Sequence, residues 1–145
     1  TMATMAASDN EERDRNCMLA SGHVKWNLAA DGVVLTKYGG GAPHADMSLT
    51  ARMCEGLGIR TAVQVSDMSW DRRAESALLF NYPEVDAIVY VGGRDTEWQV
   101  PASGRAIAGN GELSEALAAP RKLEARNVCG VSSQQGISRL RSMVH

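Results

Sequence analysis

Apolar residues recur at helical spacing near the start of the chain. Four of them stand three or four positions apart and define one apolar face: Cys17, Ala20, Val24 and Leu28. The polar segment before them fits a capping box, with Ser8 as the N-cap residue and Glu11 three positions later. The pattern therefore predicts a helix that begins just after Ser8.

Three short apolar runs follow, at residues 32–36, 60–66 and 85–91, and predict strands. The first run is continuously apolar, which suits a strand covered on both faces. Between the first two runs, a helix is expected over residues 46–57. Asp46 is its expected N-cap residue, and Gly58 is expected to terminate it.

The apolar face expected for this helix consists of Leu49, Met53 and Leu57. A shorter helix is expected over residues 72–80. Beyond Arg94 the pattern is less periodic, with a short helical stretch over residues 110–120 and a weak strand over residues 122–131.

Strands alternating with helices at this spacing predict an α/β fold, in which a Rossmann-like parallel sheet is layered with helices. Right-handed crossovers then bring the glycine-rich segment after the first strand and the Gly92-Gly93 turn after the third to one carboxyl edge. We expect a single α/β domain over residues 1–145.

One feature of the start of the chain does not fit a complete layered domain. A helix in such a domain normally follows a strand, but only "TMATMAAS" precedes the first predicted helix. Either the fold begins with a helix, or the preceding strand belongs to another polypeptide.

The composition narrows the class of protein. The 145 residues are 44% hydrophobic and 22% charged, as in a soluble globular domain, and the net charge of -2 disfavours nucleic-acid and membrane partners. No apolar run reaches the length of a membrane span, and no secretory signal is present, so a cytoplasmic location is expected. The three cysteines lack metal-binding spacing and are expected to be small buried residues, and no metal is predicted.

The segment "KYGGGAPHAD" is the first candidate for chemistry. Gly39, Gly40 and Gly41 allow a positive φ and a close approach to a ligand, and the following helix start attracts anions. A purely structural turn is the alternative, because the dinucleotide-binding spacing is absent. His44 and Asp46 at the end of the loop are candidate catalytic residues, although an isolated histidine is often simply solvated.

Thr1 is the second candidate. An N-terminal threonine can act as a nucleophile with its own α-amino group as the base, and such an end arises when a precursor cleaves itself. The alternatives are removal of an initiator methionine and an arbitrary start of the chain.

Four segments in order resemble the C-terminal portion of component B of the glycine/sarcosine/betaine reductases, in the subunit that is made as a proprotein and cleaved. They are "ASDNEERDRN", "AADGVVLTKYGGGAPHAD", "CEGLGIRTAVQVSD" and "GVSSQQGISRL". The resemblance runs from near Ala7 to the end of the chain. It implies a split or self-cleaved subunit, finished by a companion N-terminal chain in a hetero-oligomer.

The resemblance also implies a small amino-acid-derived amine as substrate. In the family an internal residue becomes a pyruvoyl group, and a selenocysteine of another subunit takes the carbon fragment. The residues expected to face this shared substrate site are Tyr38, Gly39, Gly40, Gly41, Gly92, Gly93, Ser132, Ser133 and Gln134. The cofactor is left unknown, because the pyruvoyl-forming segment is not in this sequence.

Two positions depart from the family pattern. Tyr38 stands where the family has Glu, and Ala42 where it has Asn. The altered loop suggests a reaction other than amine reduction, in specialised metabolism. Two further hypotheses remain: a non-catalytic structural or regulatory partner of a catalytic companion chain, and an independent ligand-binding domain.

Overall fold

A computed structural model describes residues 7–37, 41–66, 71, 73–77, 83–93, 95–102, 115 and 118–125. Its elements, in chain order, are α1 (Asn10–Gly22), the π-helical turn η1 (His23–Asn27), β1 (Gly32–Thr36), α2 (Ala42–Gly56), β2 (Arg60–Val65), α3 (Ala74–Ala77), β3 (Ala87–Tyr90), β4 (Glu97–Val100) and β5 (Arg121–Glu124). Helices alternate with the first three strands, which confirms the predicted α/β fold.

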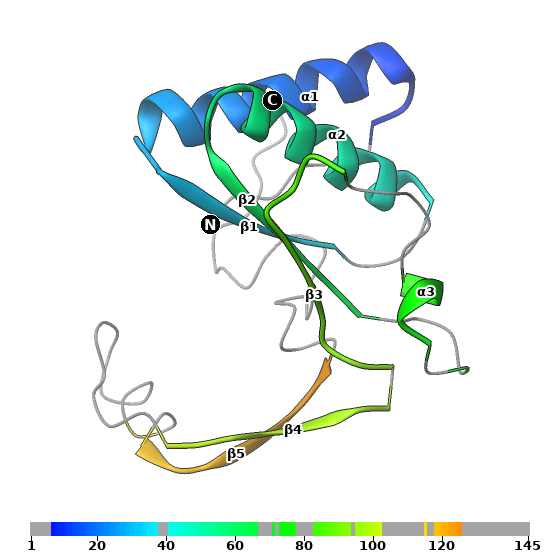
Figure 1. Cartoon of the computed structure of the whole chain (residues 1–145), viewed down its shortest axis with the longest axis vertical. Coiled ribbons are helices and arrows are strands. Elements are labelled where there is room, and N and C mark those ends of the chain that lie inside the picture. Colours follow the sequence, from blue (N-terminus) through cyan, green and yellow to red (C-terminus); the bar gives the residue numbers. More distant parts are fainter. Residues whose placement is uncertain are drawn as a thin grey trace.

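These three strands form one parallel sheet in the order β1-β2-β3. In its register Val34 lies opposite Ala62, and Ala62 lies opposite Ala87. Helices α1 and α2 lie together above this sheet (Figure 1). A second sheet pairs β4 with β5 in antiparallel orientation. Strand β5 overlaps the first residues of the strand expected over residues 122–131 and begins one residue earlier. The sequence pattern did not predict β4, whose four residues include Glu97 and Gln99.

The core lies between α2 and the parallel sheet. Met47 and Ala51 of α2 pack against Val63 and Val65 of β2, and Leu35 of β1 joins this cluster. A second cluster combines Val24 of η1 with Cys54 of α2 and with Ile59. The predicted face of Leu49, Met53 and Leu57 is only half-buried, so the buried face of α2 was wrongly predicted.

Helix α2 begins at Ala42, before the predicted start at Asp46. Gly41 is its N-cap residue, and Pro43 occupies the first turn, where its missing N–H leaves no helical bond unmade. Asp46 is therefore not the N-cap residue. Gly58, with φ +72, directly follows Leu57, the C-cap residue of α2, and so terminates the helix as predicted.

The cap of α1 is shifted by one residue from the prediction. Asp9, not Ser8, is the N-cap residue, and its carboxylate accepts a hydrogen bond of 2.8 Å from the Glu12 backbone N–H. Glu12 in turn accepts bonds from the backbone N–H and the hydroxyl of Ser8, at 2.8 Å and 2.6 Å. Asp9 and Glu12 thus stand one position later than the predicted pair, but Glu12 accepts its bonds from Ser8, the residue before the N-cap, and not from the backbone N–H of Asp9 as in a capping box.

The turn η1 changes the direction of the apolar face of the first helix. The backbone N–H of Leu28 donates to the carbonyl of His23, five residues earlier, at 3.0 Å. This wider turn rotates the following residues relative to a regular helix. Cys17, Ala20 and Val24 are buried as predicted, whereas Leu28 is 55% exposed.

Strand β1 is not covered on both faces within the described residues, contrary to the prediction. Val33 and Leu35 pack toward the helices, but Val34 points to the other face and is 63% exposed. The expected strand over residues 122–131 and helix over residues 110–120 lie largely outside the described residues.

Candidate functional site

The carboxyl edge of the parallel sheet is where the described parts of the two predicted glycine segments are found. Lys37 follows β1 and leads toward Gly41, while Gly92 and Gly93 follow β3. Because β1, β2 and β3 are parallel, their carboxyl ends share one edge. Tyr38, Gly39 and Gly40 lie outside the described residues, so their contact with a substrate stays a prediction.

Gly41 supplies the backbone conformation that starts α2. Its φ of +64 and ψ of -123 are accessible to glycine and strained for other residues. The carbonyl of Gly41 accepts hydrogen bonds from the backbone N–H groups of His44, at 3.0 Å, and Ala45, at 3.1 Å. A Cβ atom at Gly41 meets no atom of the described residues within 4 Å, and the positive φ is what favours glycine there.

His44 is fully buried in the first turn of α2, with an exposure of 0%. Burial, and second the positive charge of Lys37, lower the pKa of His44 from 6.5 to about 4. The imidazole is therefore neutral at pH 7. The alternative of a solvated histidine is wrong, and a catalytic role for His44 stays a prediction.

Asp46 is also buried, and its carboxylate contacts α1. Its Oδ1 accepts from Nε of Arg13 at 2.6 Å, with side chains 10% and 21% exposed. Its backbone carbonyl accepts from the hydroxyl of Thr50 at 2.8 Å and from the thiol of Cys17 at 3.5 Å. Residues two apart on a helix point in different directions, so Asp46 and His44 do not face each other. A catalytic role for Asp46 also stays a prediction.

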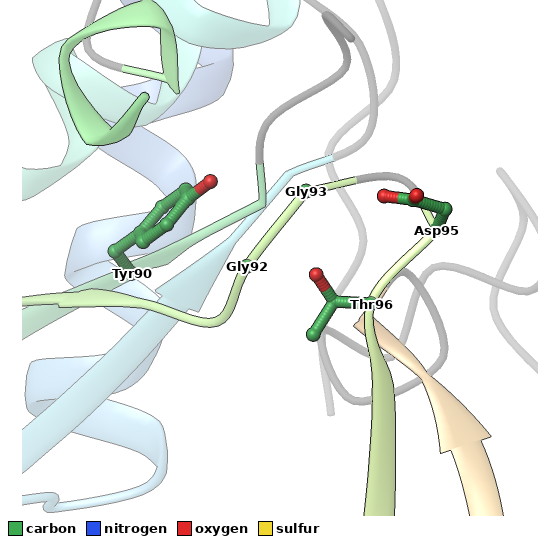
Figure 2. A pocket seen from close by; sticks show the side chains of 5 residues that line it. All are labelled: Tyr90, Gly92, Gly93, Asp95 and Thr96. Atoms are coloured by element: carbon green, nitrogen blue, oxygen red, sulfur yellow. The ribbon is translucent and has the colours of Figure 1, made fainter. Parts of the chain in front are cut away.

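A cavity of about 220 Å³ opens beside the carboxyl end of β3. The described residues that line it are Tyr90, Gly92, Gly93, Asp95 and Thr96. Figure 2 shows the side-chain oxygens of Asp95 and Thr96 directed toward the glycine backbone. Gly92 and Gly93, which the sequence predicted to bind substrate, thus lie in the wall of a cavity.

Gly92 shapes this cavity through its backbone. Its φ is +107, and a Cβ atom there would lie 2.6 Å from Oγ1 of Thr96 and 2.7 Å from two of its carbons. The backbone N–H of Thr96 donates to the carbonyl of Gly93 at 3.0 Å, which closes a tight turn. Any residue larger than glycine at position 92 would displace Thr96 or the strand end.

Two further hydrogen bonds hold the cavity wall. The indole N–H of Trp98 in β4 donates to the carbonyl of Val91 at 2.7 Å, directly before Gly92. The backbone N–H of Ala125, after β5, donates to the carbonyl of Thr96 at 2.9 Å. The small antiparallel sheet thereby fixes the segment that leaves β3.

The sequence did not predict three of the lining residues, Tyr90, Asp95 and Thr96. The available signal was their proximity to Gly92-Gly93 in the chain. The predicted site residues Thr1, Ser132, Ser133 and Gln134 lie outside the described residues.

The cysteines that the structure describes are structural. Cys17 and Cys54 are 1% and 0% exposed, and burial raises the pKa of both thiols. Among the described residues, no group of three or more His, Cys, Asp or Glu side chains could hold a metal ion. In the same part of the chain, none of the helices has the length and apolar character needed to cross a bilayer.

Comparison with known proteins identifies the family. Residues 1–127 match the model of the glycine/sarcosine/betaine reductase component B subunits, and this stretch includes both glycine segments and the cavity. The match ends before "GVSSQQGISRL", so it does not extend to Ser132, Ser133 and Gln134. A search of curated proteins and a search of solved structures found no match. With most of its length matched, the chain belongs to the family of glycine/sarcosine/betaine reductase component B subunits.

Proposed function

We propose that the chain is one subunit of a heteromeric, component-B-like enzyme that binds a small amino-acid-derived substrate at the carboxyl edge of its sheet. The cavity beside Gly92 and Gly93 carries this proposal, because it lies where open α/β sheets bind ligands. Family membership supplies the class of enzyme and the expectation of partner subunits.

The chemistry of the cavity suits a molecule with an amino group. Asp95 contributes a carboxylate and Thr96 a hydroxyl, both beside the backbone of Gly92 and Gly93, and Tyr90 adds an aromatic wall. A carboxylate attracts an ammonium group, and the hydroxyl and backbone groups can bind the polar end of the same molecule. A volume of about 220 Å³ is below the usual range for drug-sized ligands, which favours a small substrate.

Isothermal titration calorimetry tests this assignment. The co-expressed complex is titrated in turn with glycine, sarcosine and betaine. Asp95→Asn should weaken binding of the ligand that is taken by about tenfold, because it removes a charge-assisted contact. Glu97→Gln is the matched control, since Glu97 is exposed in β4 and pairs with Lys122 rather than lining the cavity. Equal affinities for wild type and Asp95→Asn would exclude the cavity as the substrate site.

The family's pyruvoyl group does not fit the described residues. In the family its precursor is usually a cysteine, but Cys17 lies in the interface of α1 with α2, and Cys54 lies in the core cluster with Val24 and Ile59. Neither lines the cavity.

Self-cleavage before Thr1 and a place in specialised metabolism are further parts of the proposal. The altered family positions Tyr38 and Ala42 support a reaction other than amine reduction. Intact-mass analysis of the co-expressed gene products tests the cleavage. A longer translated product that yields this chain supports it, and a native chain with its own initiator methionine excludes it.

A structural or regulatory role is the second candidate. It is favoured by the environment of His44 and Asp46, which are both buried in packing between elements. His44→Gln and Asp46→Asn keep side chains of similar size. Unchanged turnover of an intact complex carrying both substitutions would exclude a catalytic role for His44 and Asp46 and would favour the structural role.

A further inference from the structure

The outer side of the first helix carries large apolar side chains that solvent reaches. Met18 and Leu19 of α1 are 63% and 65% exposed, and Trp26 of η1 is 71% exposed. The inner side of the same helix is already packed, because Cys17 and Ala20 are buried where α1 meets α2. In Figure 1, α1 lies at the end of the described fold farthest from the small antiparallel sheet. The helix is therefore apolar on a side that its own core does not use.

These side chains form one continuous surface, the α1 patch, which consists of Met18, Leu19, Gly22 and Trp26. Met18, Gly22 and Trp26 follow one another at four-residue spacing and so lie along one line of the helix. The indole ring of Trp26 lies over Gly22, where a Cβ atom would be only 2.9 Å from Cζ3 of the ring. Side chains of this size and exposure present on the order of 400 Å² of apolar surface, a size typical of functional patches.

The charges at the two ends of the α1 patch indicate what covers it. Asp14 and Lys25 are eleven residues apart, which is about three turns, so they stand on the same side of the helix at opposite ends of the patch. Their midpoint lies beside Leu19. A two-fold axis there reverses the direction of a second copy of the helix and brings Lys25 of that copy opposite Asp14. The opposed charges meet twice in such a pair.

Arg15 fits the same arrangement. It lies on the line of Gly22 and Trp26, seven and eleven residues before them. Reversal about Leu19 places its guanidinium over the indole ring of the second copy, where a cation is attracted to the aromatic face. The Arg15 side chain is 67% exposed, and its ion pair with Glu12 spans 4.0 Å, so it is free to turn outward. The α1 patch is thus complementary to itself in both shape of charge and apolar content.

We propose that the α1 patch is a homodimer interface, in which the first helices of two copies of this chain pack antiparallel about a two-fold axis near Leu19. The apolar area is below the roughly 800 Å² per partner of standard stable complexes. The dimer should therefore form reversibly, with a dissociation constant on the order of 10 μM. The inference goes beyond the proposed function and depends neither on the cavity nor on a companion subunit.

Sedimentation velocity of the full chain over a concentration series, from about 1 to 200 μM, measures the association. Wild type should pass from monomer to dimer within this range. Leu19→Lys should raise the dissociation constant at least about tenfold, because the dimer would bury the added ammonium group in apolar surroundings. Val34→Lys is the matched control, since Val34 is also 63% exposed but lies on the face of the sheet away from the helices, and its dimer should be unchanged.

Charge reversal tests the antiparallel arrangement. Asp14→Lys and Lys25→Asp each place like charges opposite one another at both ends of the patch, so each alone should weaken the dimer about threefold or more. The double variant restores opposite charges with their signs exchanged and should return to the affinity of wild type. Because both positions lie in the same chain, this rescue is expected only where the helix contacts a second copy of itself.

The outcomes decide the proposal without involving the substrate site. A chain that stays monomeric through the series, a dimer that tolerates Leu19→Lys, or a double reversal that fails to rescue would each overturn it. In the co-expressed complex, native mass spectrometry should find two copies of this chain in one particle. A single copy would mean that another subunit covers the α1 patch, which overturns the homodimer but leaves the heteromeric enzyme in place.

Discussion

Buried His44 should make the stability of the protein depend on pH between about 4 and 6.5. The imidazole has a pKa of about 4 in the folded chain, lowered first by burial and then by the charge of Lys37, against 6.5 when unfolded. Between these values the unfolded chain binds a proton that the folded chain does not. Stability is therefore complete above pH 6.5 and falls as the pH is lowered toward 4.

The size of the effect follows from the two pKa values. The difference corresponds to a loss of about 2–3 kcal/mol in the free energy of unfolding between pH 7.5 and pH 4.5, of which roughly half is already lost at pH 5.5. For a domain of this size, urea slopes of about 1.5–2 kcal/mol/M turn the full loss into a midpoint shift of roughly 1–2 M.

Urea unfolding followed by circular dichroism at half-unit pH intervals measures this shift. His44→Gln removes the titrating group, so its midpoint should vary much less over the same range, whatever its stability at pH 7.5. His23→Gln is the control, because His23 is exposed at the end of α1. A wild-type midpoint that is flat from pH 7.5 to pH 4.5, or a slope that persists in His44→Gln, would refute the assignment to this histidine.

Substitutions at three further places in the fold test the geometry there. Gly92→Ala should cost about 2–4 kcal/mol in urea unfolding, because alanine is strained at φ +107 and its Cβ would overlap Thr96. Arg13→Met should cost about 1–3 kcal/mol by leaving the Asp46 carboxylate unpaired, and adding Asp46→Asn should cost less than the sum of the two in a double-mutant cycle. Asp9→Ala should lower the thermal midpoint by the equivalent of about 1 kcal/mol, because α1 loses its N-cap side chain.

Each of these has a control in the chain. Gly56→Ala places a Cβ where nothing lies within 4 Å and should be neutral or slightly stabilising, so an equal loss at Gly56 and Gly92 would contradict the special geometry of Gly92. Strict additivity of Arg13→Met and Asp46→Asn would mean that the ion pair contributes nothing. Ser8→Ala should cost less than Asp9→Ala, and the reverse order would restore Ser8 as the N-cap residue.

Sequence pattern determined the elements whose signals are local. The apolar run of β1, the alternation of helices with strands and the glycine that ends α2 were predictable because backbone propensity and hydrophobic period depend on neighbouring residues. The order of glycine segments along the chain also predicted that they share the carboxyl edge, since parallel pairing requires it.

Tertiary contacts decided which side chains are buried, how the charged groups pair and where the cavity lies. The wide turn at η1 turned Leu28 outward, and the position of α1 beside α2 took Asp46 into an ion pair with Arg13, 33 residues away in the chain. Burial of His44 changed its charge state at neutral pH. The cavity formed only when Thr96 folded back on Gly92. Each depends on residues brought together by folding, and the free energy of those contacts is not encoded in any single stretch of sequence.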